Sequence, residues 1–530
     1  MYHEKYPYVS MRNAVYSTNG MVATSQNLAS SAGLDILRKG GNAIDAAVAT
    51  AACLTVVEPT SNGIGGDNFA LVWANGKLHG LNSSGPSGND ISIEKVKQLG
   101  HEKMPTYGVL PVTVPGAVAG WEEILNKFGS MSMEEVLTPA IQYAKKGFVI
   151  SPTVGYYWRK AYEKYKEIFK SDEYKYWFDT FTPNGKVPEI GEIFRMEEHG
   201  HTLEKIAKEG SYVFYKGEIA DKIDTFFKKY GGFLTKEDLK NFKPEWVDPI
   251  SVKYRGYDIW EIPPNGQGIV CLIALGILNN IPFESSAGYI HKQIEAIKIG
   301  FSVSKKSVTD EKFMKYTAKD LLSPDFLKTL QNEIGYKAQI PKDILPQKSG
   351  TVYLTTADNK GNMVSFIQSN YMGFGSGIVI PNTGISMHNR GADFSLDEDS
   401  VNKLEPNKRT YHTIIPAFIT KDNKVVASFG VMGGYMQPQG HLQVVTQLID
   451  KKLNPQSALD APRWQWLKDN EIEIENTFEV HLAKELELKG HDVKMNLNNG
   501  SFGRGQIIAS ENGVLIGGCE PRCDSDIASY

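Results

Sequence analysis

The chain has 530 residues, of which 41% are apolar and 22% charged, with a formal net charge of −4. This composition is ordinary for a globular protein and supplies ample apolar material for a core. The sequence has no basic stripe and no polybasic run, which argues against nucleic acid and against a membrane surface as partners.

The N-terminal stretch MYHEKYPYVSMRNAVYS has no apolar h-region, so we expect no signal peptide. The longest apolar runs, residues 46–57 and 268–278, are shorter than the roughly 20 residues that span a bilayer. Two of the four cysteines lie in apolar runs, and Cys519 and Cys523 form a C-x3-C pair. Because no second pair or histidine cluster supports the latter, we expect no metal, no cofactor and a cytoplasmic location.

The first part of the chain predicts two helices and a hairpin. Residues 25–42 predict a helix with Ser25 as its N-cap and a Gly-Gly stop. The Ala-rich residues 42–58 predict a second helix that is buried on most sides. The apolar stretches 69–73 and 78–81, joined by Asn-Gly, predict a β-hairpin.

Residues 121–350 predict mostly helices, and the polar, proline-broken residues 337–350 predict a linker. After the linker, residues 351–380 predict strand, turn and strand. Residues 425–430 predict another strand, followed by a Gly-Gly turn and a helix from about His441. A final hairpin turns at Asn512-Gly513. Helices flanking several short strands indicate packed sheets covered by helices.

The step from Gly350 to Thr351, where the strand pattern begins, has a chemical interpretation. Gly350 has no side chain, so another group can approach its carbonyl closely. A threonine hydroxyl can attack that carbonyl in an N→O acyl shift, and hydrolysis of the ester would free the α-amine of Thr351. With an unperturbed pKa of roughly 7.7–8.0, the amine can act as a general base. The local sequence alone favours an ordinary strand threonine.

The segment TVYLTTADNKGNMVSFIQSNYMGFGSGIVIPNTGISMHNRGADFS resembles the nucleophile region of the gamma-glutamyltransferase (glutathione hydrolase) family. Further family motifs occur in the expected order: GGNAIDAAVATAACLTVVEPTSNGIGGDNF, LPVTVPGAVAGW, PPNGQG, GVMGGYMQPQGHLQVVTQLID, APRW and EPRCD. The resemblance covers essentially residues 20–530. The patterns SFIQSNY, NRGADFSLD and VMGGYMQPQG are most similar to a side branch that includes oxamate amidohydrolase.

This resemblance implies an α+β fold, the four-layer αββα sandwich of the N-terminal nucleophile hydrolases, made as one precursor. Cleavage between Gly350 and Thr351 would give a large subunit, residues 1–350, and a small subunit, residues 351–530. The two would remain intertwined as one domain. The sequence leaves assembly into a homo-oligomer open.

The resemblance also implies roles for individual residues. Thr351 takes the nucleophile position, and Ser369 takes the place where the family usually has a second threonine. Asp393 takes the position that binds the substrate's α-amino group. Gly433 and Gly434 take the oxyanion hole, where two successive backbone N–H groups can face a tetrahedral oxyanion. Outside the motif set, this glycine pair fits a plain strand-to-helix turn.

The chain departs from the family where the glutamyl α-carboxylate is bound. Family members have an arginine just after the first hairpin, but the segment here is LNSSGPSG, with Ser84 near that place. Serine cannot replace the bidentate bonds of arginine. The family's Ser-Ser pair for the same carboxylate is His412-Thr413 here, and His412 fits a structural histidine equally well. Arg390 is the better replacement cation by its spacing to the aspartate of ADFS, and Arg409 fits a surface charge equally well.

We therefore expect a self-processing threonine amidohydrolase that acts on a small-molecule amide, with a γ-glutamyl amide such as glutathione as the default substrate. The missing arginine makes another small acidic amide, such as oxamate, an alternative. A short stretch between Asp393 and His412 predicts a short lid, which favours hydrolysis over transfer. A second alternative is an unprocessed relative that only binds a ligand or partner.

Overall fold

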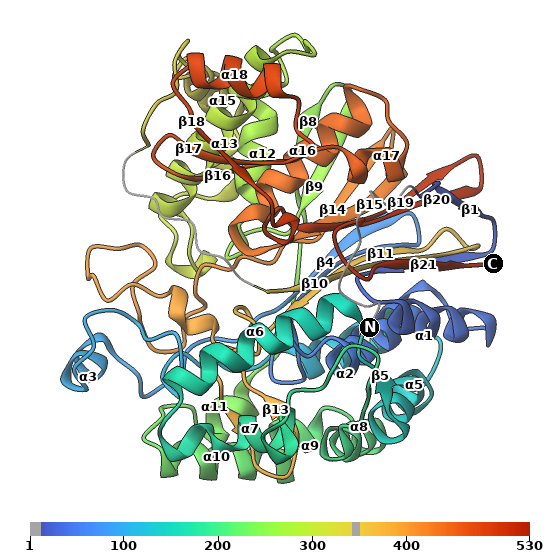
Figure 1. Ribbon diagram of the computed structural model, residues 1–530, viewed down its shortest axis with the longest axis vertical. Coiled ribbons are helices and arrows are strands. Elements are labelled where there is room, and N and C mark those ends of the chain that lie inside the picture. Colours follow the sequence, from blue (N-terminus) through green and yellow to red (C-terminus); the bar gives the residue numbers. More distant parts are fainter. Residues whose placement is uncertain (1–11, 342–349) are drawn as a thin grey trace.

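A computed structural model describes residues 12–341 and 350–530. Two seven-stranded antiparallel sheets lie face to face, and helices cover the outer face of each sheet (Figure 1). The predicted four-layer αββα arrangement is thereby confirmed. Residues 342–349 of the predicted linker lie outside the described residues.

The lower sheet of Figure 1 combines strands from both sides of Gly350. Its interior strand β10 pairs with β2 on one side and with β11 on the other. The strand order is β21 (Asp526–Ser529), β2 (Gly20–Thr24), β10 (Val352–Asp358), β11 (Met363–Ser369), β3 (Asp67–Ala74), β4 (Lys77–Ser83) and β7 (Glu245–Val247).

The upper sheet is also built from both parts of the chain. Its order is β1 (Val15–Ser17), β20 (Val514–Cys519), β19 (Arg504–Glu511), β15 (Lys424–Met432), β14 (Ala417–Lys421), β9 (Tyr257–Glu261) and β8 (Ile250–Tyr254). Smaller sheets pair β5 (Phe148–Val149) with β6 (Ile193–Phe194), β12 (Val379–Ile380) with β13 (Ile385–Ser386), and β17 (Glu471–Glu475) with β16 (Trp464–Lys468) and β18 (Asp492–Asn496).

Two sets of helices form the outer layers. Helices whose apolar faces join the core below the lower sheet are α1 (Asn27–Arg38), α2 (Ala43–Val57), α4 (Ala117–Phe128), α5 (Met133–Lys146), α6 (Pro152–Ile168), α7 (Lys175–Phe181), α8 (Glu197–Glu209), α9 (Tyr212–Tyr215), α10 (Glu218–Lys229) and α11 (Lys236–Asn241). Above the upper sheet lie α12 (Gly268–Leu278), α13 (Ala287–Ser307), α14 (Ala318–Leu321), α15 (Pro324–Gln331), α16 (Gln437–Ile449), α17 (Pro455–Asp460) and α18 (Val480–Leu488). Helix α3 (Ile93–Gln98) packs in a separate small cluster.

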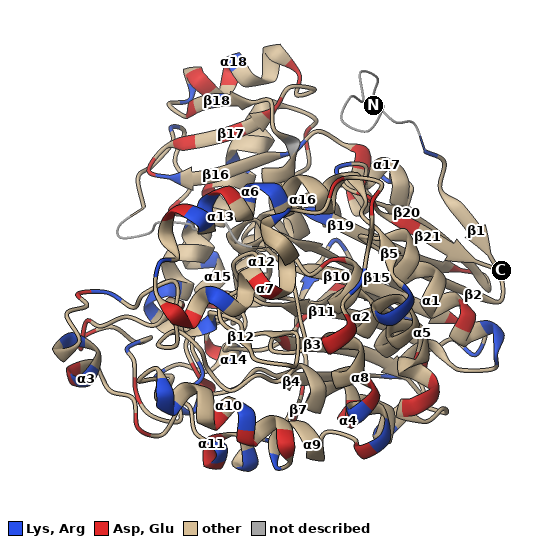
Figure 2. Cartoon of the chain, turned by 60° about the horizontal axis from the view of Figure 1, so that its bottom comes forward, with Lys and Arg blue, Asp and Glu red and all other residues tan. Residues whose placement is uncertain are grey.

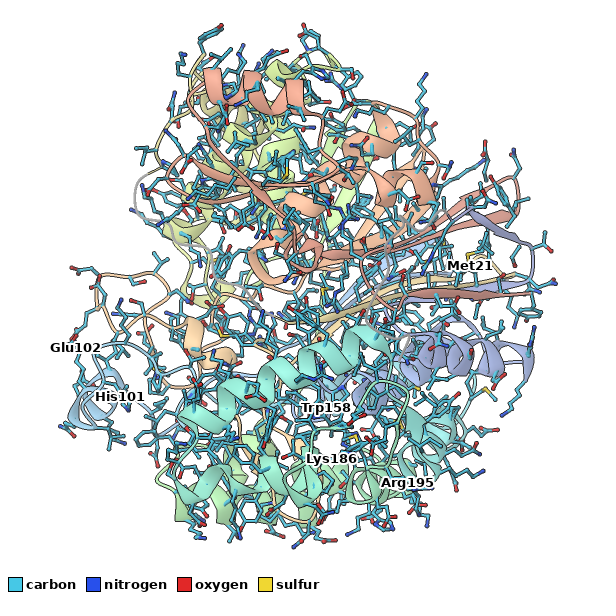
Figure 3. All side chains as sticks on the ribbon, viewed as in Figure 1. Met21, His101, Glu102, Trp158, Lys186 and Arg195 are labelled. Atoms are coloured by element: carbon cyan, nitrogen blue, oxygen red, sulfur yellow. The ribbon has the colours of Figure 1, made fainter. Side chains whose placement is uncertain are left out.

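Alternation along the strands divides the apolar side chains between the layers. In β10, Val352 and Leu354 face the lower helices, whereas Tyr353 faces the upper sheet. Met21 of β2, labelled in Figure 3, belongs to the same inner core between the sheets. Trp158 of α6, also labelled there, is fully buried in the lower core. Successive side chains of a strand point to opposite faces of the sheet. Both faces of β10 are therefore apolar, as expected for a sheet that is buried on both sides.

Several local predictions are confirmed and others are wrong. Helix α2 lies where predicted and is buried on all sides, and the hairpin β3–β4 turns at Asn75-Gly76. The N-cap of α1 is Gln26 and not Ser25, because the Gln26 side chain accepts from two backbone N–H groups. Strands β7, β8 and β9 interrupt the region predicted to be mostly helical, and α16 begins at Gln437 rather than near His441.

Charged side chains of both signs alternate over the outer helices, as α10 and α11 show in Figure 2. In the part of the chain that the structure describes, no helix combines the length and the apolar character needed to cross a membrane.

Gly430 of β15 lies against the Tyr353 ring of the other sheet, where the two sheets pack closely. A Cβ atom on Gly430 would lie 2.4 Å from Cε2 of Tyr353, a ring that is fully enclosed. We predict that Gly430→Ala lowers the free energy of unfolding by about 1–3 kcal/mol, because overpacking forces the ring or the strand to move. Denaturant titration measures the change.

Gly288→Ala is the matched control, since a Cβ on this α13 residue meets no atom closer than 3.4 Å. It is expected to leave the unfolding midpoint unchanged or slightly raised, because alanine favours the helix. Equal midpoints for the two variants would contradict the tight contact between the sheets.

Candidate active site

Thr351 directly precedes β10, an interior strand of the lower sheet, and is fully buried. Its hydroxyl donates to the carbonyl oxygen of Gly350 at 2.7 Å. The hydroxyl of Ser369, at the end of β11, lies 2.9 Å from the same carbonyl oxygen and 3.1 Å from Thr351 Oγ1. Two hydroxyl groups thus converge on one peptide carbonyl, which is the arrangement that polarises a carbonyl for attack.

The hairpin and the loop after it hold this carbonyl in place. Val352 of β10 pairs with Gln368 of β11, so the two strand ends bring Thr351 and Ser369 together. The Tyr371 N–H donates to Ser369 Oγ at 2.7 Å, and the Gly350 N–H donates to the Tyr371 carbonyl at 2.7 Å. Tyr371 has a φ of 73°, in the left-handed region that costs free energy for a tyrosine. The loop therefore wraps around Gly350 through a strained residue.

Gly433 and Gly434 form the turn between β15 and α16. Their φ angles of 140° and 61° lie in the region that favours glycine. Gln267 donates from one amide nitrogen to the carbonyl oxygens of Gly434 and Thr413, at 2.8 and 2.6 Å. The turn is therefore held from behind by a buried amide side chain.

Gly350 and Gly433 line one cavity of about 680 Å³. Among the residues that line it are Lys160 and Lys164 of α6 and Arg504 of β19. The predicted cleavage site and the first glycine of the predicted oxyanion hole thus face the same space.

A cluster of charged and phenolic groups surrounds Asp393. Its Oδ1 accepts from the hydroxyl groups of Tyr371 at 2.9 Å and Tyr435 at 3.1 Å. Burial raises the pKa of both phenols, so they keep their protons and donate. Arg390 lies 3.6 Å from Asp393 Oδ2, stacks over the Tyr371 ring at 4.0 Å and donates to Thr413 Oγ1 at 2.9 Å. Asp393, Arg390 and Thr413, all predicted site residues, are thereby brought together.

Lys305 of α13 completes the cluster, and no sequence motif pointed to it. Its ammonium lies 3.9 Å from the centre of the Tyr411 ring and 4.3 Å from that of Tyr435, whose hydroxyl it contacts. Burial lowers the pKa of Lys305 to about 8, although Asp393 opposes the shift. A lysine in an ordinary helical SVSKKS segment carries no signal of this role, because its partners come from distant segments.

The cluster keeps unused hydrogen-bonding capacity. Nε and Nη2 of Arg390 and Oδ2 of Asp393 are buried and make no hydrogen bond within the described residues. Burial lowers the pKa of Arg390, and the Asp393 carboxylate opposes the shift. A guanidinium group stays charged in proteins. Because unpaired buried polar atoms cost free energy, a donor pair beside a free carboxylate oxygen indicates a place for a ligand with both charges.

His412 pairs with Asp67 and not with Asp393. Its Nε2 donates to Asp67 Oδ2 at 3.1 Å, and His388 Nδ1 lies 3.3 Å from the same oxygen. Burial lowers the pKa of His412 to about 3, so it is neutral. Burial alone would raise the pKa of Asp67, but the two histidines hold it below its ordinary range. The His412 side chain is therefore hydrogen-bonded to Asp67, whereas the hydroxyl of the adjacent Thr413 accepts from Arg390.

Ser84 and Arg409 contact each other and not the cluster. Arg409 donates from Nε to the Ser84 carbonyl at 2.8 Å and from Nη1 to Glu245 at 2.8 Å. The Ser84 hydroxyl donates to Asn82 at 2.8 Å. Arg409 is thus a buried, paired cation that lies against Ser84, and not a surface charge.

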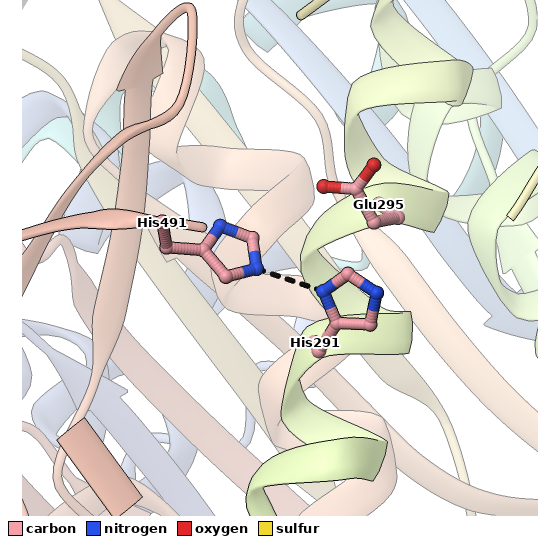
Figure 4. Close-up of side chains that lie close together, drawn as sticks. All are labelled: His291, Glu295 and His491. Atoms are coloured by element: carbon pink, nitrogen blue, oxygen red, sulfur yellow. Dashed lines mark hydrogen bonds between the residues drawn. The ribbon is translucent and has the colours of Figure 1, made fainter. Parts of the chain in front are cut away.

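A separate buried cluster has the residue types of a metal site (Figure 4). His291 Nδ1 and His491 Nε2 are 2.9 Å apart, His291 Nε2 donates to the Gly335 carbonyl, and Lys298 pairs with Glu295 at 2.8 Å. Lys298 already neutralises the carboxylate. If Nε2 of His491 ligated a metal, its Nδ1–H would be left without a described partner. The cluster therefore fits a hydrogen-bonded network better than a metal.

The four-layer fold places the chain among the N-terminal nucleophile hydrolases. The Gamma-glutamyltranspeptidase family model matches residues 29–530, so the chain belongs to this family. It is 38% identical to the glutathione hydrolase-like YwrD proenzyme of Bacillus subtilis, over 97% of this chain and 99% of the relative. It is 31% identical to the oxamate amidohydrolase proenzyme of Klebsiella pneumoniae, over 98% of this chain and 100% of the relative.

A crystal structure of cephalosporin acylase from Bacillus halodurans matches 100% of this chain and 99% of its own, with a TM-score of 0.97 and 53% identity. The family resemblance found in the motifs is therefore confirmed.

Glu58, which is buried beside Arg504, should make the free energy of unfolding depend on pH. Burial raises its pKa to about 7, although Arg504 and Ser25 oppose the shift. Since an unfolded glutamate titrates near pH ~4.3, the folded state binds more protons between these values, and stability falls as pH rises through this window. We predict that Glu58→Gln removes this fall.

Denaturant titrations of the wild type and Glu58→Gln at pH 5, 6, 7 and 8 test the point. The difference in unfolding free energy between the two proteins should shift against the wild type as pH rises. A difference that is constant with pH would contradict the assignment, since all other titrating groups are common to both proteins.

Proposed function

We propose that this protein is an amidohydrolase that cuts its own chain at Gly350–Thr351 and then uses Thr351 as its nucleophile. The observation that carries the proposal is the convergence of the Thr351 and Ser369 hydroxyls on the Gly350 carbonyl, at 2.7 and 2.9 Å. The curated relatives that are named proenzymes support it.

In the self-cleavage step, Thr351 Oγ attacks the Gly350 carbonyl carbon while Ser369 stabilises the developing negative charge on its oxygen. The C–N bond breaks, the acyl group moves to Oγ as an ester, and the nitrogen takes the proton. Water then hydrolyses the ester, which leaves a carboxylate at Gly350 and a free amine at Thr351. The products are a large subunit, residues 1–350, and a small subunit, residues 351–530.

In the amidase reaction, the Thr351 α-amine takes the proton from Oγ as Oγ attacks the substrate carbonyl. The N–H groups of the Gly433-Gly434 turn bind the oxyanion, and the amine returns the proton to the leaving amine. Water then attacks the ester on Thr351 and releases the acid. Hydrolysis, rather than transfer to a second amine, is the outcome we propose.

The Asp393 cluster selects the acyl group. Arg390, with two free N–H groups, takes a carboxylate in the role of the family arginine missing at Ser84, and Lys305 adds a second positive charge. Asp393 Oδ2 takes an ammonium group. An acyl group with both charges, such as γ-glutamyl, satisfies these atoms better than an acyl group with a carboxylate alone.

Oxamate, which has a carboxylate and no ammonium, is the second candidate substrate. Support for it comes from the 31% identity to a relative named oxamate amidohydrolase and from the serines at the family arginine's place. The 53% identity to a structure titled cephalosporin acylase supports an acylase activity on such compounds as a further candidate.

Self-cleavage is tested on a denaturing gel. We predict two fragments for the purified wild type, with the shorter one starting at Thr351 by N-terminal sequencing, and a single chain for Thr351→Ala. Ser369→Ala should slow processing by about 10²–10³-fold, as removal of an oxyanion donor does elsewhere. A wild-type chain that stays whole would instead support the non-catalytic relative.

The acyl-group assignment is tested with γ-glutamyl-4-nitroanilide, glutaryl-4-nitroanilide and oxamate. We predict that the wild type prefers the γ-glutamyl over the glutaryl compound by about 10-fold or more in kcat/KM, since a charged hydrogen bond to Asp393 is worth roughly 1.5–3 kcal/mol. Asp393→Asn should abolish the preference, and Arg390→Met should raise KM for both anilides.

Equal turnover of the two anilides by the wild type would refute the role of Asp393. Turnover of oxamate alone would make the second candidate the function.

A further inference from the structure

His441 is a fully buried histidine of α16 that takes no part in the proposed steps of the reaction. Helix α16 begins shortly after the Gly433-Gly434 turn, to which we assign the oxyanion. The imidazole of His441 reaches back to β15, the strand before the turn, where its Nε2 accepts from the Val431 N–H at 3.0 Å. One side chain therefore bridges the two elements that the turn joins.

The Val431 N–H needs this acceptor because the sheet does not provide one. Val431 pairs with Gly505 of β19 on one side of β15. On the other side, β14 pairs with β15 only as far as Phe429, so the pairing ends before Val431 is reached. Val431 is fully buried, and a buried N–H group without an acceptor costs free energy. His441 therefore replaces a strand partner at the end of β15.

Glu261 fixes the state of the histidine ring. Since Val431 donates to Nε2, this nitrogen has a free lone pair, and a neutral ring then carries its proton on Nδ1. Burial lowers the pKa of His441 to about 3, so the ring is neutral. The Nδ1–H donates to Glu261 Oε1 at 2.7 Å, and both side chains are fully enclosed. Glu261 thus selects the tautomer that accepts from Val431.

The segment that begins with Glu261 also holds the turn from another side. Glu261 ends β9, and Gln267, which caps the start of α12, donates to the Gly434 carbonyl at 2.8 Å. Gly440 of α16 lies so close to β15 that a Cβ atom on it would be 2.6 Å from Val431 Cγ1. Glycines have no side chain with which to fix their own N–H groups, so the surrounding contacts must orient the turn.

We propose that His441 is a positioning residue of the amidase reaction, which ties α16 to Val431 and Glu261 and thereby fixes the Gly433-Gly434 turn in the geometry that binds the oxyanion. This proposal rests on the proposed amidase function and adds a residue that touches neither the substrate nor the reacting atoms. Both the attack of Thr351 and the later attack of water pass through a tetrahedral oxyanion, so a displaced turn slows both steps.

Two substitutions separate the two hydrogen bonds of the histidine. Glutamine places its amide oxygen near the position of Nε2 and still accepts from Val431, whereas asparagine reaches Glu261 but not Val431. With γ-glutamyl-4-nitroanilide, His441→Asn should lower kcat by about 10-fold or more while KM changes by less than about two-fold. This loss is smaller than the roughly 10²–10³-fold for a deleted donor, because both N–H groups remain. His441→Gln should keep kcat within about three-fold of the wild type.

Self-cleavage serves as the folding control, since its proposed mechanism uses Ser369 and not the glycine turn. His441→Asn should be processed as fully as the wild type on a denaturing gel. His199→Asn is the matched substitution, because His199 is equally enclosed and bonds to Thr55 Oγ1 at 2.9 Å and to the Gly384 carbonyl at 3.1 Å, within the lower helix layer. It should keep the wild-type kcat. Equal losses of kcat in the two asparagine variants, or a His441→Asn chain that stays whole beside a processed wild type, would overturn the proposal.

Hydrogen exchange followed by mass spectrometry examines the turn without any substrate. A peptide that covers residues 430–436 should exchange faster in His441→Asn than in the wild type, and His441→Gln should retain the wild-type rate. If the wild type hydrolyses none of the amides, the proposed function fails, while the exchange rates still decide whether His441 holds the turn. Unchanged exchange in His441→Asn, or faster exchange with an unchanged kcat, would refute the positioning role.

Discussion

The Gly350 carbonyl, approached by the hydroxyls of Thr351 and Ser369, is the contact on which the rest of the site depends. This contact forms because β10 and β11 pair inside a buried sheet. The start of β10 and the end of β11 lie at the same end of that sheet. Tyr371, which has a left-handed φ, then closes the loop: its carbonyl accepts from the Gly350 N–H, and its N–H donates to Ser369 Oγ. The sheet core therefore supplies the rigidity that a near-attack geometry requires.

The same loop connects the reacting centre to the selection of substrate. Tyr371 holds the Ser369 hydroxyl with its backbone and Asp393 with its side chain, so one residue fixes both positions. Thr413 contacts Arg390, and its carbonyl shares the Gln267 amide with Gly434. Displacement of the acyl-binding cluster would thus also disturb the turn that we assign to the oxyanion. In the proposed mechanism, binding of the correct acyl group and alignment of the carbonyl are one event.

Much of the fold was predictable because it depends on local patterns. The buried helix α2, the hairpins β3–β4 and β10–β11, and the Gly-Thr step all have signals within a few residues of sequence. The hairpin β8–β9 was missed, since it lies among strong helical segments and gains its stability by pairing with β14 across the chain. Lys305 was missed for the same physical reason: its ring contacts come from residues more than a hundred positions away.

Some buried arginines of this molecule are fully paired with carboxylates, whereas two others keep unused donors. Arg409 pairs with Glu245 at 2.8 Å, and Arg463 pairs with Glu520 at 2.9 Å, because an unpaired buried charge is costly. Arg390 and Arg504, in contrast, each keep a free Nε although each has an acidic neighbour. Arg390 lies in the Asp393 cluster, and Arg504 lines the cavity beside Gly350. The unused donors of Arg390, beside the free oxygen of Asp393, are most simply explained by the charged acyl group that we propose as the substrate.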